Sequence, residues 1–69
     1  MFGEQEAVVV DVTPFPLHGV TYYDVTVVFQ DRSVQQARLG PEGVPEGVQA
    51  GDHVMAMRAG NLVVSLRKA

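Results

Sequence analysis

The sequence predicts an all-β domain, a small five-stranded barrel with at most one short helical turn. Fourteen of the 69 residues are Val and none is Ile, and Val is stiff at χ1 and favours the pleated surface of a sheet. Residues 20–29 alternate between apolar and polar side chains, which is typical of a half-buried strand. Gly60-Asn61 separates two apolar runs of strand length, and this pattern indicates a hairpin.

The first strand is expected over residues 7–12. Val8, Val9 and Val10 form a continuous apolar run, which predicts a strand covered on both faces or in contact with another subunit. Proline cannot donate a hydrogen bond to a neighbouring strand, so the strand should end at Thr13-Pro14-Phe15-Pro16. Residues 13–19 are then a loop.

The second strand, residues 20–29, is the longest. Side chains alternate between the faces of a strand, which places Tyr23, Val25, Val27 and Phe29 in the core. The opposite face carries Tyr22, Asp24, Thr26, Val28 and Gln30.

A turn at residues 30–33 leads to a third strand, residues 33–39, which has few apolar residues and is expected at an edge of the sheet. Its predicted inward residues are Ala37 and Leu39. Its outward residues are Val34, Gln36 and Arg38.

Residues 40–51 contain Pro-Glu-Gly-Val twice in succession, which is too few copies for a repeat architecture. We expect a loop or a single helical turn in which Val44 and Val48 plug one end of the barrel, the alternative being a binding motif. The hairpin that follows supplies the last two strands. Its predicted core residues are Val54, Ala56, Leu62, Val64 and Leu66.

The composition indicates one domain, residues 1–69, with a small core. Such a chain buries only about 60% of the surface it exposes when unfolded. There is no Cys to form a disulfide, and apolar residues make up 46% of the chain. We therefore expect self-association into a homo-oligomer. The absence of Ile and the preference for Arg over Lys suggest a GC-rich genome and a thermophile.

The formal net charge is −3. A domain that grips nucleic acid through phosphates is normally basic, so the charge disfavours that class. The acidic N-terminus does not resemble a signal peptide, and no apolar stretch reaches the ~18 residues of a membrane helix. A cytoplasmic location without a membrane partner is expected.

No motif predicts catalysis, a cofactor or a metal. His18 and His53 are the only imidazoles, and they lack the spacing of a metal site. Ser33 and Ser65 have no context for nucleophilic activation. Gly40, Gly43 and Gly47 do not lie between a strand and a helix, as a phosphate loop requires. We therefore expect a protein that is not an enzyme and that takes no cofactor.

The candidate partner-binding residues lie around the proline-rich segment, residues 13–18. Two prolines stiffen a segment that also carries Phe and Leu, which predicts either an apolar lip for a partner or a cap over the open end of the barrel. An outward Tyr22, with Gln36 and Arg38 across the hairpin, would resemble a base-stacking face; the alternative is an ordinary surface tyrosine. The candidates are Phe15, Leu17, His18, Tyr22 and Arg38.

Residues 48–54, followed by Gly60-Asn61-Leu62-Val63-Val64, resemble the closing hairpin of small five-stranded barrels of the OB-like or SH3-like kind. They are also similar to the soluble OB domain of NfeD-type membrane proteins. The resemblance covers roughly the last twenty residues and implies a barrel fold. It implies no functional residue, because such barrels host many unrelated functions.

These observations predict a β-barrel module that binds a protein partner or itself. One alternative is an OB-type domain that binds single-stranded nucleic acid through Phe15, Tyr22, Arg32 and Arg38. Another is a non-catalytic subunit of an enzyme whose chemistry lies on a different chain.

Overall fold

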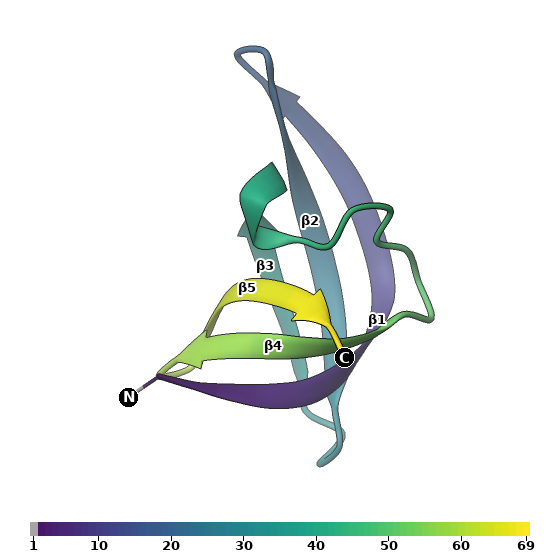
Figure 1. Ribbon diagram of the computed structural model, residues 1–69, viewed down its shortest axis with the longest axis vertical. Coiled ribbons are helices and arrows are strands. Elements are labelled where there is room, and N and C mark those ends of the chain that lie inside the picture. Colours follow the sequence, from purple (N-terminus) through teal and green to yellow (C-terminus); the bar gives the residue numbers. More distant parts are fainter. Residues whose placement is uncertain (1) are drawn as a thin grey trace.

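The computed structural model describes residues 2–69 as a curled, five-stranded antiparallel sheet in the order β3-β2-β1-β4-β5 (Figure 1). The strands are β1 (Phe2–Leu17), β2 (Val20–Phe29), β3 (Val34–Leu39), β4 (His53–Ala59) and β5 (Leu62–Lys68). A single 3₁₀ turn, η1 (Pro41–Gly43), follows β3. The all-β prediction with one short helical turn is confirmed.

β1 is the central strand and belongs to both halves of the sheet. Its first part, to Val8, pairs with β4, and its longer part, from Ala7 onward, pairs with β2. The sheet curls so that the edge strands β3 and β5 approach each other, and η1 packs against β2 and β5. Within residues 2–69 no ladder hydrogen bonds join these two edges, so the sheet is curled without being closed.

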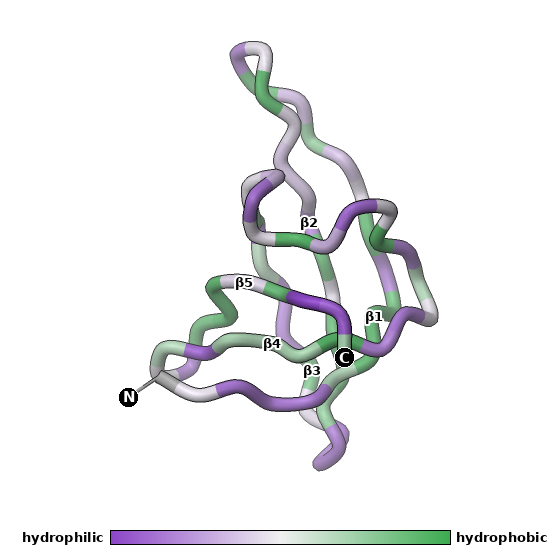
Figure 2. The backbone as a smooth tube through the Cα atoms, viewed as in Figure 1, coloured by the Kyte–Doolittle hydropathy of each residue, from purple (hydrophilic) through white to green (hydrophobic). Residues whose placement is uncertain are grey.

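The core lies inside this curl, where the hydrophobic segments of several strands converge (Figure 2). The alternation predicted for β2 is confirmed, because Val25, Val27 and Phe29 are buried and Tyr23 packs against them. Val44 and Val48 also pack on the core, as predicted for a plug at one end. The buried apolar residues are Ala7, Val9, Val25, Val27, Phe29, Leu39, Val54, Ala56, Val63 and Leu66.

The predicted inward face of β5 is wrong at two of its three residues. Met57 lies opposite Ser65 but Arg58 lies opposite Val63, so Val64 is an extra residue in a β-bulge. The bulge reverses the alternation, which buries Val63 and leaves Leu62 and Val64 69% and 43% exposed. Leu66 lies beyond the bulge and is buried as predicted.

A second bulge explains the run of three valines in β1. The register with β2 shifts between Val9 and Asp11, so Val10 has no partner residue on β2. Val9 is fully buried, whereas Val10 is 47% exposed. The prediction that this run of valines forms a strand covered on both faces is therefore wrong within the chain. The backbone of Val9 is instead held by Gly51 N–H, which donates to its carbonyl, and by Asp52 O, which accepts from its N–H.

β1 does not end at Thr13 as predicted but continues through both prolines to Leu17. Pro14 and Pro16 lie opposite Tyr23 and Thr21. The two-residue turn after Leu17 makes Leu17 and Val20 a hydrogen-bonded pair, so the alternate positions 14 and 16 are in non-hydrogen-bonded pairs and face the open edge of β1, where no donor is needed. Proline is compatible with this strand because only one side of it is paired.

Residues 13–22 therefore form a two-stranded arm and not a loop. His18 and Gly19, with φ of 51° and 80°, make the two-residue turn that joins its strands. The arm extends beyond the rest of the molecule (Figure 1). No residue between 13 and 18 packs against the core, so the alternative in which this segment caps the barrel is wrong.

Candidate functional site

The outer face of β1, β2 and β3, which points away from the core, carries most of the predicted binding residues. The pairing arranges its side chains in rows that run across the strands. From the tip of the arm to the opposite end, the rows are Leu17–Val20, Phe15–Tyr22, Thr13–Asp24–Arg38, Asp11–Thr26–Gln36 and Val8–Val28–Val34. This surface is called the outer face below.

The arm end of the outer face is apolar. Leu17 and Val20 flank the tip and are 44% and 41% exposed. Phe15 lies opposite Tyr22 in the next row, and both are half-buried. Cross-strand pairs of this kind stabilise a hairpin, yet a two-stranded ribbon has no second layer to cover its apolar face.

Arg38 connects the apolar rows to the polar ones. Its guanidinium lies 3.9 Å from the centre of the Phe15 ring and donates two hydrogen bonds to the Asp24 carboxylate, at 2.7 and 3.0 Å. These hydrogen bonds hold the pKa of Asp24 below its ordinary value and raise that of Arg38. The guanidinium is therefore fixed in position and its charge is balanced within the chain.

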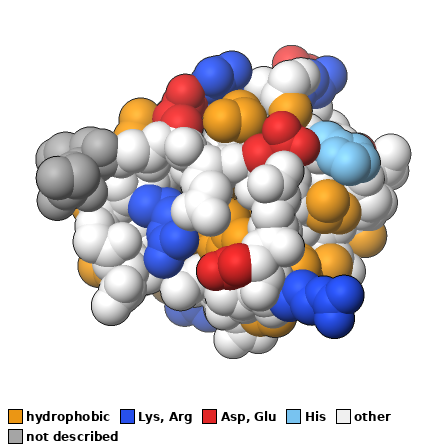
Figure 3. Space-filling view, turned by 90° about the horizontal axis from the view of Figure 1, so that it is seen from below, with side chains coloured by type: hydrophobic (Ala, Val, Ile, Leu, Met, Phe, Trp, Pro, Cys, Tyr) orange, Lys and Arg blue, Asp and Glu red, His pale blue; other side chains and the backbone are white. Residues whose placement is uncertain are grey.

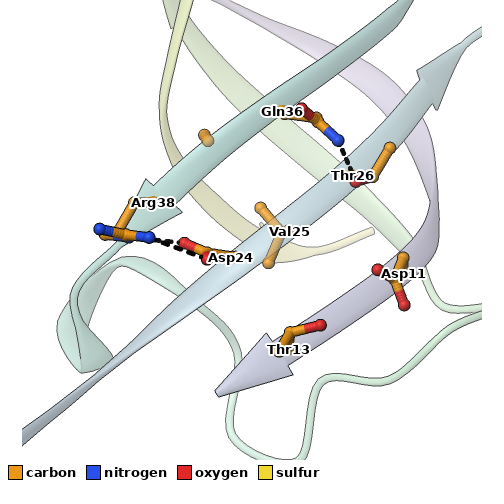
Figure 4. Close-up of a pocket in the computed structure, with 8 residues that line it drawn as sticks. Asp11, Thr13, Asp24, Val25, Thr26, Gln36 and Arg38 are labelled. Carbon is orange, nitrogen blue, oxygen red and sulfur yellow. Dashed lines mark hydrogen bonds and ion pairs between the residues drawn. The ribbon is translucent and has the colours of Figure 1, made fainter. Parts of the chain in front are cut away.

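The two polar rows border a shallow hollow of about 520 Å³, lined by Asp11, Thr13, Asp24, Val25, Thr26, Gln36, Ala37 and Arg38 (Figure 4). Gln36 donates to the Thr26 hydroxyl at 3.4 Å across β2 and β3. The side chains of Asp11 and Thr13 project from β1 beside it (Figure 4). The hollow offers hydroxyl, amide and carboxylate groups for hydrogen bonds to whatever covers it.

The far end of the outer face is a row of three valines, Val8, Val28 and Val34. Val34 is 57% exposed and the other two are half-buried. Val10, the exposed residue of the β1 bulge, lies near this end. The outer face thus has two apolar ends separated by a polar centre.

The structure brings Phe15, Leu17, Tyr22 and Arg38 together on this face and places His18 in the turn at the tip. The sequence interpretation missed Val20, because it treated residues 13–19 as a loop, and it missed the valine row, because that row exists only through the pairing of β1, β2 and β3. A two-residue turn at His18-Gly19 is the signal that would have shown Leu17 and Val20 to be opposite each other.

The other arginines proposed for nucleic-acid binding lie elsewhere. Arg32 is in the β2–β3 turn, at the opposite end of β2 from the arm. Arg58 faces inward, 4.8 Å from the centre of the Phe29 ring, and donates to Gln5 Oε1 at 2.9 Å. At the end of the molecule opposite the arm, basic and acidic side chains are interspersed (Figure 3). Arg38 is thus the basic residue that accompanies Phe15 and Tyr22.

Among residues 2–69 no group of three or more His, Cys, Asp or Glu side chains is placed to hold a metal ion. Nor does that part of the chain contain a helix long and apolar enough to span a membrane. No protein-family model matches the chain, and no curated protein or solved structure is significantly similar to it. The site must therefore be interpreted from its own geometry.

Proposed function

We propose that this protein is a non-enzymatic binding module of the OB type that contacts a protein surface through its outer face. The carrying observation is the arm, which holds Phe15, Leu17, Val20 and Tyr22 on one face beyond the core. A two-stranded hairpin alone is only marginally stable in water. A partner that covers the apolar face of the arm explains why it is there.

The arm is suited to binding because its backbone is already restricted before a partner arrives, so little conformational entropy is lost on binding. The type I′ turn at His18-Gly19 and the prolines at 14 and 16 restrict its backbone. The guanidinium of Arg38, which belongs to the neighbouring row, packs on the ring of Phe15 and restricts it. Preorganised aromatic side chains lose little conformational entropy on binding, and they commonly dominate the energy of protein interfaces.

Binding of single-stranded nucleic acid is the second candidate, supported by the adjacent Phe15 and Tyr22 on β1 and β2. Stacking contributes about 1–3 kcal/mol per base. Against this, Asp24 already neutralises Arg38, and Asp11 adds a carboxylate to the same face. With so few free cations, the phosphate backbone would contribute little affinity.

A role as the non-catalytic subunit of an enzyme uses the same surface, with the chemistry on the partner. It is distinguished from a regulatory or structural contact only by the identity of the partner. A cytoplasmic location is part of the proposal and agrees with the acidic, Cys-free sequence.

The test is affinity capture from the native cell with quantitative mass spectrometry. Phe15→Ala and Leu17→Ala should each lose the partner, whereas the control Leu62→Ala, exposed on β5, should retain it. Circular dichroism verifies that each variant is folded. Partners retained by both arm variants would contradict the proposal. Submicromolar binding of an oligonucleotide, lost in Tyr22→Ala or Arg38→Ala, would favour the second candidate.

A further inference from the structure

We infer that the partner of the outer face is a second copy of this chain, packed face to face and antiparallel across a two-fold axis. This inference rests on the proposed function and names its partner. It starts from the order of the rows, which is apolar, polar, polar, apolar from the Phe15–Tyr22 row to the valine row. A surface with this pattern is complementary to itself when it is turned end to end.

The symmetry operation follows from the pattern. Two identical surfaces meet in an isologous contact when a two-fold axis relates them. The axis lies in the plane of the interface, perpendicular to the strands and between the two polar rows. Each Thr13–Asp24–Arg38 row then faces the partner's Asp11–Thr26–Gln36 row, and each Phe15–Tyr22 row faces the valine row.

The polar rows are complementary residue by residue under this operation. The Thr13 hydroxyl faces the carboxylate of Asp11 in the other copy, and the Thr26 hydroxyl faces that of Asp24. The charge of Arg38 is already balanced by the Asp24 carboxylate of its own chain. Its guanidinium faces the amide oxygen of Gln36 in the other copy. Each carboxylate or guanidinium thus meets a neutral hydrogen-bonding group, and like charges are not placed directly opposite each other.

The apolar rows match in the same arrangement. Phe15 and Tyr22 of one copy cover Val8, Val28 and Val34 of the other, and the reverse contact forms at the other end. Packed sheets are rotated by roughly 30°, which shifts the row ends sideways by about one strand spacing of ~4.8 Å. The valine row spans β1, β2 and β3, so a shift toward β3 leaves the aromatic pair of β1 and β2 above the valines of β2 and β3.

Of the six large hydrophobic residues with high exposure among the described residues, Val10 and Val34 lie on or beside the four paired rows, and Leu17 and Val20 lie on the same face beyond them. Pairing through the free edge of β1 is a different mode of dimerisation, and Pro14 and Pro16 block it. The sequence therefore protects the edge of the arm and leaves its face available. This combination favours face-to-face packing.

The first test uses chemical cross-linking, which the absence of cysteine makes specific. Tyr22→Cys and Val28→Cys are prepared separately, mixed, and treated with a bismaleimide that spans the ~10 Å between packed sheets. The mixture should yield a heterodimer by intact mass. Each variant alone should yield little product, because equivalent residues lie on opposite sides of the axis, roughly 20 Å apart along the strands.

The second test measures solution mass by sedimentation over a concentration series. The wild type should reach twice the 7.5 kDa of one chain. Tyr22→Lys and Val34→Glu should each be monomeric alone. Mixed together they should recover the dimer, because one contact becomes a Lys–Glu pair and the other is wild type. Leu62→Glu, on β5, should dimerise normally.

Two results would overturn the inference. One is a wild type that stays monomeric at millimolar concentration, and the other is efficient cross-linking of Tyr22→Cys to itself. If either holds while Phe15→Ala still loses a different captured protein, the proposed function stands and only the identity of the partner is wrong. A dimer that persists in both charge variants, together with capture unaffected by Phe15→Ala, would contradict both proposals.

Discussion

Two arginines of this chain lie on aromatic rings but differ in the hydrogen-bond acceptors of their guanidinium groups. Arg38, on the outer face, stacks on Phe15 and shares a bidentate ion pair with Asp24. Arg58, at the inner side of β4, stacks on Phe29 and reaches only the amide oxygen of Gln5. Its Nε is buried without a hydrogen-bond partner in the described residues. The first arrangement positions a surface group, and the second closes part of the core.

Phe29 should dominate the stability of β2. It is 2% exposed and lies beneath Arg58, and removing a buried aromatic ring costs about 3–5 kcal/mol. Phe29→Ala should lower the free energy of unfolding by that amount in urea titrations. Thr26→Ala, on the outer face of the same strand, should change it by less than about 1 kcal/mol. Equal effects would mean that the two faces of β2 are wrongly assigned.

The Asp24–Arg38 pair should make stability depend on pH in the acid range. The pKa of Asp24 is lowered from 3.8, chiefly because Arg38 donates hydrogen bonds to its carboxylate. A carboxyl whose pKa is lower in the folded state than in the unfolded state stabilises the fold at pH values above its unfolded-state pKa. This stabilisation is lost as the pH falls through its folded-state pKa. The melting temperature should therefore drop below about pH 3.8. In Asp24→Asn that drop should be smaller, whereas an unchanged profile would contradict the pairing.

At the scale of the elements, the five strands and their order along the chain were predictable, but the bulges and the continuation of β1 to Leu17 were not. The alternation in β2 and the turn at Gly60-Asn61 depend on local chemistry that the sequence shows directly. The bulges at Val10 and Val64 depend on how β1 and β5 fit their neighbours. The β5 bulge replaces Val64 by Val63 in the core, and identical side chains hide such a shift, whereas the β1 bulge keeps Val9 in the core and turns Val12 inward in place of Asp11. Phe15, Leu17 and Tyr22 were found because they are large apolar or aromatic residues, whereas the rows that they form required the pairing.

The β5 bulge can be tested with two adjacent valines. Val63 is 7% exposed and Val64 is 43% exposed. Val63→Ala should cost about 1.5–3 kcal/mol, from lost burial plus a small cavity. Val64→Ala should stay within about 0.5 kcal/mol. The comparison needs only chemical denaturation of both variants, and the opposite ranking would show that β5 continues without a bulge.

The prolines of the arm should act against association through the strand edge. In the double variant Pro14→Thr, Pro16→Thr, the free edge of β1 regains two N–H donors in an extended strand of β-favouring residues. We expect the far-ultraviolet circular dichroism of the monomer to be retained and light scattering to grow with time. Thr21→Val, on the paired strand of the arm, serves as the matched control. A double variant that stays as soluble as the wild type would show that the prolines have no protective role.

At the scale of the whole molecule, hydrogen bonds connect the strands without a break from β3 through β2, β1 and β4 to β5. The two edge strands β3 and β5 meet at a seam that no ladder hydrogen bonds close within the described residues. Side chains close the seam where backbone hydrogen bonds do not. Gly43 of η1 lies there, and a methyl group added to it would be 3.6 Å from Leu39 Cβ and 3.7 Å from the Val64 carbonyl oxygen. Away from this seam, the Arg67 guanidinium donates two hydrogen bonds to the Glu4 carboxylate and so links β5 to β1.

The open seam should be the first part of the fold to exchange amide hydrogens. The strands β2 and β4 are paired on both sides over most of their length, whereas β3 and β5 each have one unpaired edge. Local opening is cheapest where few backbone hydrogen bonds must break. Native-state hydrogen exchange followed by NMR should therefore show lower protection in β3 and β5 than in the doubly paired parts of β2 and β4. Uniform protection across all five strands would mean that the seam is closed in solution.

The boundary between arm and core also sets how this chain can change in length. The last arm-side residues that pack on the core are Val12 and Tyr23, so everything beyond them can be lengthened or shortened without altering the interior. Removing one residue from each strand would turn the tip over and exchange its two faces. Removing two from each keeps the apolar side where it is. Insertions and deletions in descendants of this sequence should therefore come four residues at a time, symmetrically about His18-Gly19, and change the reach of the arm while preserving what it presents.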